Sequence, residues 1–347
     1  MSKITFTKKS FDLGTASIAV LAAFGVQLFV QLIVSLFGLS DVAYTWTVVI
    51  ANQVVLFGVG IFFCFYHKVD PLAITGAKKP PKWYYFPIFA MIALCCVLCF
   101  GPISGLFSRF LTWLGYDYTP QYYVPMKNGG LFALAFLALT ILPIFGEEIL
   151  LRGVLMSGTK DRTPLFSIFY TAMIFAFMHG NLNQIVHQFL LGAVMGYLVY
   201  LTGGIYASAT VHFVNNALAL LLDYGRANGW INKVFYWYVG GKLAAEPTII
   251  GMSVSLFAIL MLLVLVTCLL HRERSETKTY FPSDRKLSER ITAYLLYLST
   301  ATKEEEEEAT ERTEKKPFDR YALVMAIVLA AVTVGVVLLT LIPGVGK

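Results

Sequence analysis

Long and nearly uninterrupted apolar stretches recur along this chain, separated by short polar segments. An α-helix needs about 20 mostly apolar residues to cross the hydrocarbon core of a bilayer, whereas the strands of a membrane barrel alternate apolar and polar residues over about ten positions. The pattern therefore predicts an all-α fold, a polytopic helical membrane bundle with about eight or nine transmembrane helices. The nine candidate stretches are Leu13–Phe37, Thr45–Tyr66, Tyr84–Phe110, Leu131–Met156, Leu165–His179, Gln184–Leu201, Gly204–Asp223, Thr248–Leu270 and Tyr321–Ile342.

The fifth to seventh of these stretches are shorter than the others and are interrupted by polar residues. The bilayer interior offers no hydrogen-bonding partner for a free backbone group or a polar side chain. We therefore expect these three segments to be enclosed by neighbouring helices, or to be broken.

Composition supports the membrane assignment, and the distribution of lysine and arginine predicts the orientation of the chain in the membrane. The 347-residue chain is 57% hydrophobic and 14% charged, whereas soluble domains are about one-quarter charged. A cytoplasmic N-terminus would put 21 lysines and arginines on the inner side and six on the outer side. The positive-inside rule therefore predicts a cytoplasmic N-terminus and, with nine spans, an external C-terminus. We expect a multi-pass protein of the cell membrane, with the lipid bilayer as its main surrounding.

The net charge of +6 is explained by this topology. No basic stripe with interleaved aromatic residues is present, so nucleic acid is not an expected partner. The first apolar stretch, about 25 residues long, exceeds the apolar region of a cleavable signal peptide. The five cysteines lie within or at the ends of apolar spans, where we expect small packing residues rather than a disulfide framework: Cys64, Cys95, Cys96, Cys99 and Cys268.

The distribution of charge divides the chain into three parts. Residues 1–270 form the expected membrane-embedded bundle, residues 271–320 a charged cytoplasmic linker, and residues 321–347 an additional C-terminal transmembrane helix. The linker contains an acidic run, Glu304–Glu308, and is a candidate binding segment for a cytosolic partner. Its apolar residues at helical spacing predict an amphipathic helix on the inner leaflet: Leu287, Ile291, Tyr294, Leu295 and Leu298.

Ionisable residues inside membrane spans are costly and usually functional. In the fourth span, Glu148 and Arg152 are four residues apart with the acid first, the order that favours an ion pair on a helix. Glu147 lies about 100° around the helix from Glu148 and has no such partner, which leaves it available for chemistry. Gly146 beside it permits the close approach of a backbone or a substrate.

Polar residues of the next spans fall at compatible spacings. Phe175 and His179 share one face of the fifth span, and His212 and Asn216 share one face of the seventh. An imidazole and an amide on one face can both donate hydrogen bonds to a developing oxyanion. By helix rise, Glu147 and these residues lie near the midplane of a core about 30 Å thick. A structural ion cluster is the alternative interpretation of the glutamates, and His187 is expected to be structural or supporting.

These motifs, in order and inside apolar spans, resemble the CPBP family of intramembrane proteases, also called the type II CAAX prenyl endopeptidase or Abi family. The resemblance covers about 131–222, which we take as the catalytic core, and includes Gly203-Gly-Ile-Tyr-Ala before the seventh span's motif. It implies a hydrolase that cleaves a membrane-associated peptide or protein without a cofactor. The motifs are Glu-Glu-x-x-x-Arg (Glu147, Glu148, Arg152), Phe-x-x-x-His (Phe175, His179) and His-x-x-x-Asn (His212, Asn216).

The resemblance also implies a role for each motif residue. Glu147 would be the general base that deprotonates water, and His179 would position that water. His212 and Asn216 would form the oxyanion hole. The remaining motif residues would support the site structurally: Glu148, Arg152 and Phe175.

Three alternatives remain open from the sequence. Glu147, His179 and His212 could form a His₂Glu zinc set. The chain could instead be a non-catalytic membrane scaffold or a bacteriocin-immunity-type protein that binds a partner through the linker. A transporter with a midplane ion site would show inverted repeats, whereas the polar set here occupies one contiguous stretch. Nothing in the sequence shows that a substrate is prenylated.

Overall fold

The computed structural model describes residues 10–116, 126, 128–230 and 246–274. Eight of the nine predicted spans are helical, and the ninth lies outside the described residues, as do the linker's acidic run and its amphipathic segment. The separate helices are α1 (Leu13–Ser35), α2 (Asp41–Tyr66), α3 (Pro71–Ile74), α4 (Tyr85–Trp113), α8 (Pro164–Met178), α9 (Leu182–Thr202), α10 (Tyr206–Ala227) and α12 (Glu246–Arg274).

The fourth predicted span forms one helical segment, residues 129–158, which we call the central helix. It contains α5 (Gly129–Phe136), η1 (Leu137–Ile141), α6 (Leu142–Glu147), η2 (Glu148–Leu155) and α7 (Met156–Gly158), where η1 and η2 are π-helical. Pro143 follows η1 and has no N–H to donate to the carbonyl of Leu139, four residues earlier. π-helical turns of this kind are rare and often occur at functional sites.

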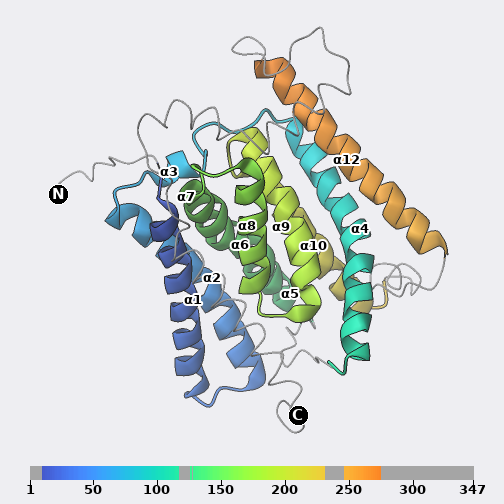
Figure 1. Cartoon of the computed structure of the whole chain (residues 1–347). Helices are drawn as coiled ribbons and strands as arrows, with labels where there is room; N and C mark the ends of the chain where they lie inside the picture. The colour runs from blue at the N-terminus through green and yellow to red at the C-terminus, as the bar shows by residue number, and fades with distance from the viewer. Residues whose placement is uncertain (1–9, 117–125, 127, 231–245, 275–347) are drawn as a thin grey trace.

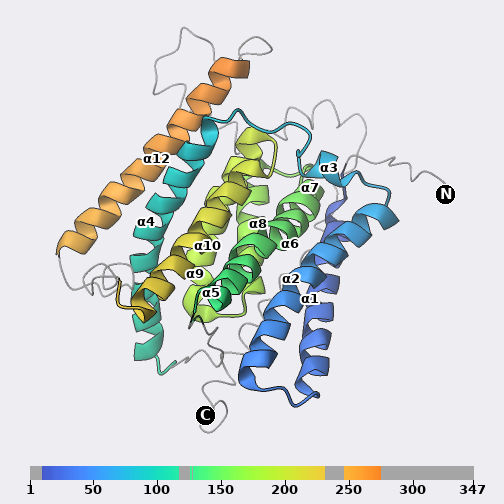
Figure 2. The same cartoon turned by 180° about the vertical axis from the view of Figure 1, so that it is seen from behind.

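The bundle is arranged around the central helix. α1 and α2 form a hairpin at one edge, and α2 packs against α6 and η2. At the other edge α12 packs against α4, and α4 packs against α9 and α10 (Figures 1 and 2). α8 and α9 form a tight hairpin between these edges, so the polar motifs of the central helix, α8 and α10 are surrounded by other helices.

Six described segments are long and apolar enough to cross a membrane, by length and composition. They are α1, α2, α4, the central helix, α9 and residues 251–270 of α12. Of the segments expected to be enclosed or broken, α8 has 15 residues and α9 has 21, long enough to cross a membrane. Both are unbroken and pack against neighbouring helices. Together with large exposed apolar residues such as Phe29, Phe62 and Phe257, these helices identify a polytopic helical membrane protein.

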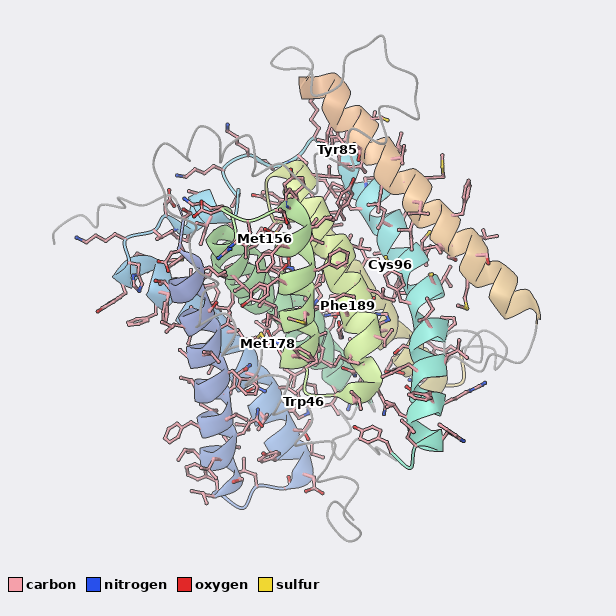
Figure 3. The ribbon with its side chains drawn as sticks, viewed as in Figure 1. Trp46, Tyr85, Cys96, Met156, Met178 and Phe189 are labelled. Carbon is pink, nitrogen blue, oxygen red and sulfur yellow. The ribbon has the colours of Figure 1, made fainter. Side chains whose placement is uncertain are left out.

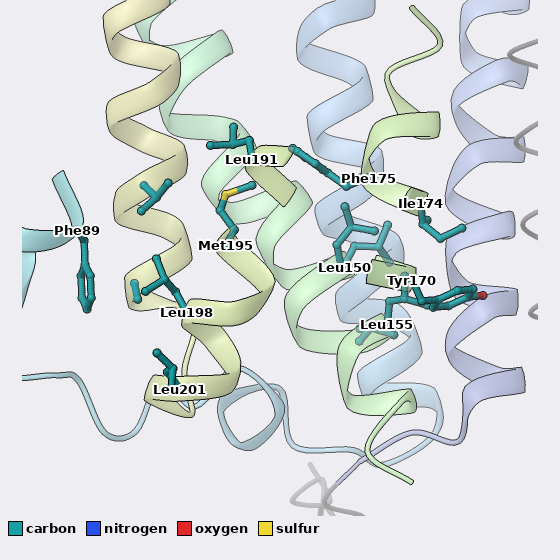
Figure 4. Packing of buried hydrophobic residues seen from close by; sticks show 14 of the residues in the cluster. Phe89, Leu150, Leu155, Tyr170, Ile174, Phe175, Leu191, Met195, Leu198 and Leu201 are labelled. Atoms are coloured by element: carbon teal, nitrogen blue, oxygen red, sulfur yellow. The ribbon is translucent and has the colours of Figure 1, made fainter. Parts of the chain in front are cut away.

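Side chains fill the space between the helices (Figure 3). Figure 4 shows the core close to the site, where Leu150 and Leu155 of η2 face Ile174 and Phe175 of α8. The α8–α9 hairpin is close because of small residues. A Cβ added to Gly192 would lie 3.0 Å from the Ala172 Cα, which fits the small-residue contacts common between membrane helices.

The cysteines behave as the sequence indicates. All five are free, and Cys64, Cys95, Cys96 and Cys99 are buried within helices while Cys268 is exposed. Cys95, Cys96 and Cys99 belong to the main apolar cluster. They therefore act as packing residues of α4.

A glycine contact joins the turn after α3 to the turn between α9 and α10. Gly76 has φ +62°, and an added Cβ would lie 2.1 Å from the Gly203 carbonyl oxygen. We expect Gly76→Ala to lower the free energy of unfolding by about 2–4 kcal/mol, because overpacking and left-handed strain add. The thermal midpoint of the purified protein in detergent measures this.

Gly38→Ala is the matched control for that prediction. Gly38 has φ +60° but nothing lies within 4 Å of an added Cβ, so this variant carries only the backbone strain of about 1–2 kcal/mol. Equal losses in the two variants would show that the contact with Gly203 contributes nothing.

Candidate active site

Glu148, the first residue of η2, lies at the centre of a buried polar cluster. Its side chain is fully buried, and its Oε1 lies 2.9 Å from His212 Nδ1 and 3.7 Å from Arg152 Nη1. Its other oxygen accepts a 2.5 Å hydrogen bond from the Ser208 hydroxyl. The predicted pairing of Glu148 with Arg152 is therefore present, but the carboxylate also binds two side chains of α10.

Arg152 is buried beneath an aromatic ring. Its guanidinium carbon lies 4.4 Å from the centre of the Phe175 ring, a favourable cation–π geometry. Its three guanidinium nitrogens have no hydrogen-bond partner among the described residues. The ion pair with Glu148 and the ring of Phe175 therefore supply its interactions.

Glu147 has two carboxylate oxygens in different surroundings. Oε1 accepts a 2.9 Å hydrogen bond from Gln53 Nε2 on α2. Oε2 is buried without a hydrogen-bond partner among the described residues and lies 3.7 Å from His212 Nε2. A buried carboxylate oxygen without a hydrogen-bond partner lowers the stability of the fold. This atom is therefore the best-placed acceptor for a proton from a bound water or substrate.

A cavity of about 160 Å³ lies beside Glu147. Glu147 and His179, which are separated by 32 positions in the sequence, both line it. The volume is sufficient for several water molecules or a small part of a peptide. Its wall is formed by α1, α2, the central helix and α8, through Gln27, Asn52, Gln53, Leu56, Glu147, Leu151, Phe175, Met178 and His179.

His179 directly follows the last residue of α8 and lines the cavity. Its Nδ1 lies 2.8 Å from the Phe175 carbonyl oxygen. Because a carbonyl can only accept, Nδ1 carries the hydrogen, and in a neutral ring Nε2 is then the acceptor. Its imidazole can therefore hold a water by one hydrogen bond while Glu147 takes a proton from it.

His212 lies between the two glutamates. The Glu148 carboxylate accepts from Nδ1, which leaves Nε2 directed towards Glu147. With both glutamates ionised and Arg152 charged, protonation of His212 makes this group electrically neutral. A protonated Nε2 can donate a hydrogen bond to an oxyanion.

Asn216 lies on the same helix as His212, and neither residue is among those that line the cavity. Its Nδ2 donates to the Leu139 carbonyl at 3.0 Å, and its Oδ1 accepts from Asn215 Nδ2 at 3.2 Å. Asn215 Oδ1 in turn lies 3.2 Å from His187 Nε2. The structure thus joins Asn216 to the Leu139 carbonyl and, through Asn215, to His187. One amide hydrogen of Asn216 remains for other partners.

We expect Asn216→Ala to lower the free energy of unfolding by about 1–3 kcal/mol, because two buried polar partners lose a hydrogen bond. Thermal unfolding in detergent measures the loss. In a Pro143→Ala background the loss should be smaller, because residue 143 then has an N–H for the Leu139 carbonyl. Identical losses in both backgrounds would contradict this role for Asn216.

Several residues of the site were not predicted from the sequence. Gln53, Gln27 and Asn52 come from α1 and α2, far from the motifs in sequence, and Ser208 and Asn215 come from α10. Amides within otherwise apolar spans were the available signal, since buried polar groups need partners. Only the packing of α2 on α6 shows which partner Gln53 has.

A metal site is the chemical alternative for this cluster. Among the described residues, no group of three or more His, Cys, Asp and Glu side chains is arranged to hold a metal ion. Glu147, His179 and His212 are therefore not arranged as such a group in this geometry.

Together, the helices and the site define a class: a polytopic membrane protein with a buried carboxylate–imidazole centre beside a small cavity. Within it, residues 129–218 match the family described as type II CAAX prenyl endopeptidase, Rce1-like. This match confirms the family resemblance expected from the three motifs, all of which lie inside the matched segment. No curated protein matches the chain. No solved structure matches it either.

Proposed function

We propose that this protein is an intramembrane endopeptidase that hydrolyses a peptide bond of a membrane-associated peptide or protein. The observation that carries the proposal is the Glu147 carboxylate, whose Oε2 is buried and unpartnered among the described residues and lies 3.7 Å from His212 Nε2. Glu147 also lines a cavity together with His179. A general base must reach a bound water, and a nearby cation must meet the developing negative charge.

The reaction follows from these positions. A water held by His179 Nε2 gives a proton to Glu147, and the resulting hydroxide attacks the scissile carbonyl carbon. The carbonyl oxygen becomes negative and accepts a hydrogen bond from His212 Nε2, with the remaining amide hydrogen of Asn216 as a second donor. Glu147 then passes the proton to the departing amine nitrogen as the C–N bond breaks. Water is consumed, and no cofactor is required.

Glu148 and Arg152 do not contact the substrate in this mechanism and act through His212. The Glu148 carboxylate bonds His212 Nδ1 at 2.9 Å and so fixes the ring with Nε2 towards Glu147. Arg152 balances the charge of Glu148, and Phe175 covers the guanidinium.

The description of the matched family suggests prenylated peptides as one substrate class, and a multi-pass location in the cell membrane fits the helices. The test uses the full-length protein in liposomes with an internally quenched peptide carrying a prenylated cysteine near its C-terminus. An identical peptide without the prenyl group, and an apolar membrane-spanning peptide, are the comparisons. Mass spectrometry identifies the cleaved bond.

The expected result is cleavage of at least one of these peptides that persists in the presence of a zinc chelator. Loss of cleavage with chelator, and its recovery with added zinc, would favour the His₂Glu zinc set instead. Absence of cleavage of all three peptides, together with an unchanged cellular phenotype in the Glu147→Gln variant, would overturn the proposal in favour of a scaffold.

A further inference from the structure

Helix α2 supplies the closest hydrogen bond to the candidate base. Gln53 Nε2 donates to Glu147 Oε1 at 2.9 Å across 94 positions of sequence. Gln53 lies outside the segment that matches the family, residues 129–218. The side chain that holds Glu147 is therefore contributed by a part of the chain that the three motifs do not include.

Gly146 fixes how Gln53 approaches. A Cβ added to Gly146 would lie 2.8 Å from Gln53 Oε1 and 2.9 Å from the Gln53 backbone oxygen. The expectation that Gly146 admits another backbone is thus met by α2. An ionised carboxylate only accepts hydrogen bonds, so the amide nitrogen must face Glu147 and the amide oxygen must lie against Gly146.

The Gln53 bond makes the two oxygens of Glu147 chemically different. Oε1 is occupied, while Oε2 has no hydrogen-bond partner among the described residues. A neutral donor stabilises the carboxylate by a charge-assisted bond but leaves its negative charge in place. A lysine or arginine at position 53 would instead neutralise the charge needed for proton transfer.

The other groups around Glu147 cannot replace this donor. Among the described residues, His212 of α10 lies 3.7 Å from Glu147 Oε2, and His179 of α8 lines the same cavity. Arg152 of η2 is paired with Glu148 at 3.7 Å. The cavity residues of α1 and α2 carry no charge.

We propose that Gln53 is a positioning residue for catalysis: its amide occupies Oε1 of Glu147 and turns the carboxylate so that Oε2 is the one oxygen that receives the proton. This inference rests on the proposed function for its catalytic consequence. The effect of Gln53 on the reactivity of the Glu147 carboxyl group can be measured without any substrate.

The first experiment measures that reactivity directly in the full-length protein in detergent. Dicyclohexylcarbodiimide is an apolar reagent that modifies buried carboxyl groups in their protonated form, and mass spectrometry gives the rate of modification at Glu147. Glu147→Gln identifies the modified peptide. In Gln53→Leu we expect the rate at neutral pH to rise by roughly ten- to a hundredfold, the equivalent of losing one hydrogen bond to a charged group.

Thr267→Val is the control for the labelling. Thr267 lies on α12, its hydroxyl lies 3.4 Å from the Tyr197 hydroxyl, and it does not line the cavity. The labelling rate at Glu147 in this variant should equal that of the wild type. Gln53→Met, which keeps the length of the side chain, replaces Gln53→Leu if the latter does not fold. Wild-type labelling in a folded Gln53 variant would overturn the inference.

The second experiment uses peptide cleavage and the nearly isosteric Gln53→Glu. At acidic pH the introduced carboxyl group is protonated and donates to Glu147, so activity should approach that of the wild type. As pH rises, the introduced carboxyl group loses this proton and repels Glu147, and activity should fall by about tenfold or more. A purely structural role for Gln53 predicts no such difference in pH profile.

The two experiments separate the two proposals. If no peptide is cleaved but Gln53→Leu accelerates labelling, the endopeptidase is wrong and the Gln53–Glu147 interaction stands. The opposite outcome is that cleavage depends on Glu147, Gln53→Glu follows the wild-type pH profile, and labelling in Gln53→Leu is unchanged. In that case the proposed endopeptidase activity is supported and Gln53 is not a positioning residue.

Discussion

Replacement of Glu147 by glutamine is expected to reduce peptide cleavage by about a hundred- to ten-thousandfold, the usual contribution of a general base. Glutamine keeps the size of the side chain and an oxygen that can accept from Gln53 Nε2, so the fold should persist. It lacks the negative charge of Oε2, which has no hydrogen-bond partner among the described residues. Initial rates with the quenched peptide in liposomes measure the effect on turnover.

Thr267→Val is the matched control for this variant. Thr267 is on α12, and its hydroxyl lies 3.4 Å from the Tyr197 hydroxyl on α9, away from the cavity. This variant should cleave at the wild-type rate after correction for the amount of folded protein. Full activity in Glu147→Gln would exclude Glu147 as the base, and with it the proposed mechanism.

Replacement of Glu148 by alanine is expected to be the most destabilising single change in the site. It leaves the Arg152 guanidinium buried without its carboxylate and removes the acceptor of His212 Nδ1 and of the Ser208 hydroxyl. Loss of one partner of a buried ion pair costs about 3–5 kcal/mol of unfolding free energy. Chemical or thermal unfolding of the purified protein measures this, and expression should fall as well.

A double variant distinguishes stability from chemistry at this position. Glu148→Leu with Arg152→Met replaces the ion pair by apolar side chains of similar size, a change that is often neutral for stability. It should recover most of the unfolding free energy lost in Glu148→Ala. Cleavage should stay low, because His212 still lacks the carboxylate that orients it. Recovery of both properties would show that Glu148 has no part in orienting His212.

The helices were predictable because their cause is local. An uninterrupted apolar stretch must form a helix in lipid, since each backbone N–H then finds its carbonyl within the same segment. The ends were also encoded locally: Thr163 Oγ1 accepts from Phe166 N at the start of α8, and Asn181 Oδ1 accepts from Asn183 N at the start of α9. The sixth span was expected to be enclosed or broken, and it is the continuous helix α9, packed against α4, α8 and α10. A polar side chain that finds a partner on a neighbouring helix, as His187 finds Asn215, does not interrupt its helix.

The site was predictable only where helical spacing sets the geometry. The interval of four residues between Glu148 and Arg152 was sufficient to predict their ion pair. Helical spacing did not reveal that His212 takes the Glu148 carboxylate, because the two belong to helices 64 positions apart. It also did not reveal the Asn216–Leu139 bond, which depends on where α10 crosses the π-helical turn beside Pro143.

The sequence by itself determined that this protein is a helical membrane bundle, that its ionisable residues cluster in one stretch, and that Glu147 has no partner on its own helix. These are consequences of burial and of helical periodicity, which act over a few residues. Only the tertiary structure decided that Gln53 of α2 holds one oxygen of Glu147, that His212 bridges towards both glutamates, and that Glu147 and His179 share a cavity. Such contacts depend on the crossing of separate helices, which small residues such as Gly146 permit and no local pattern specifies.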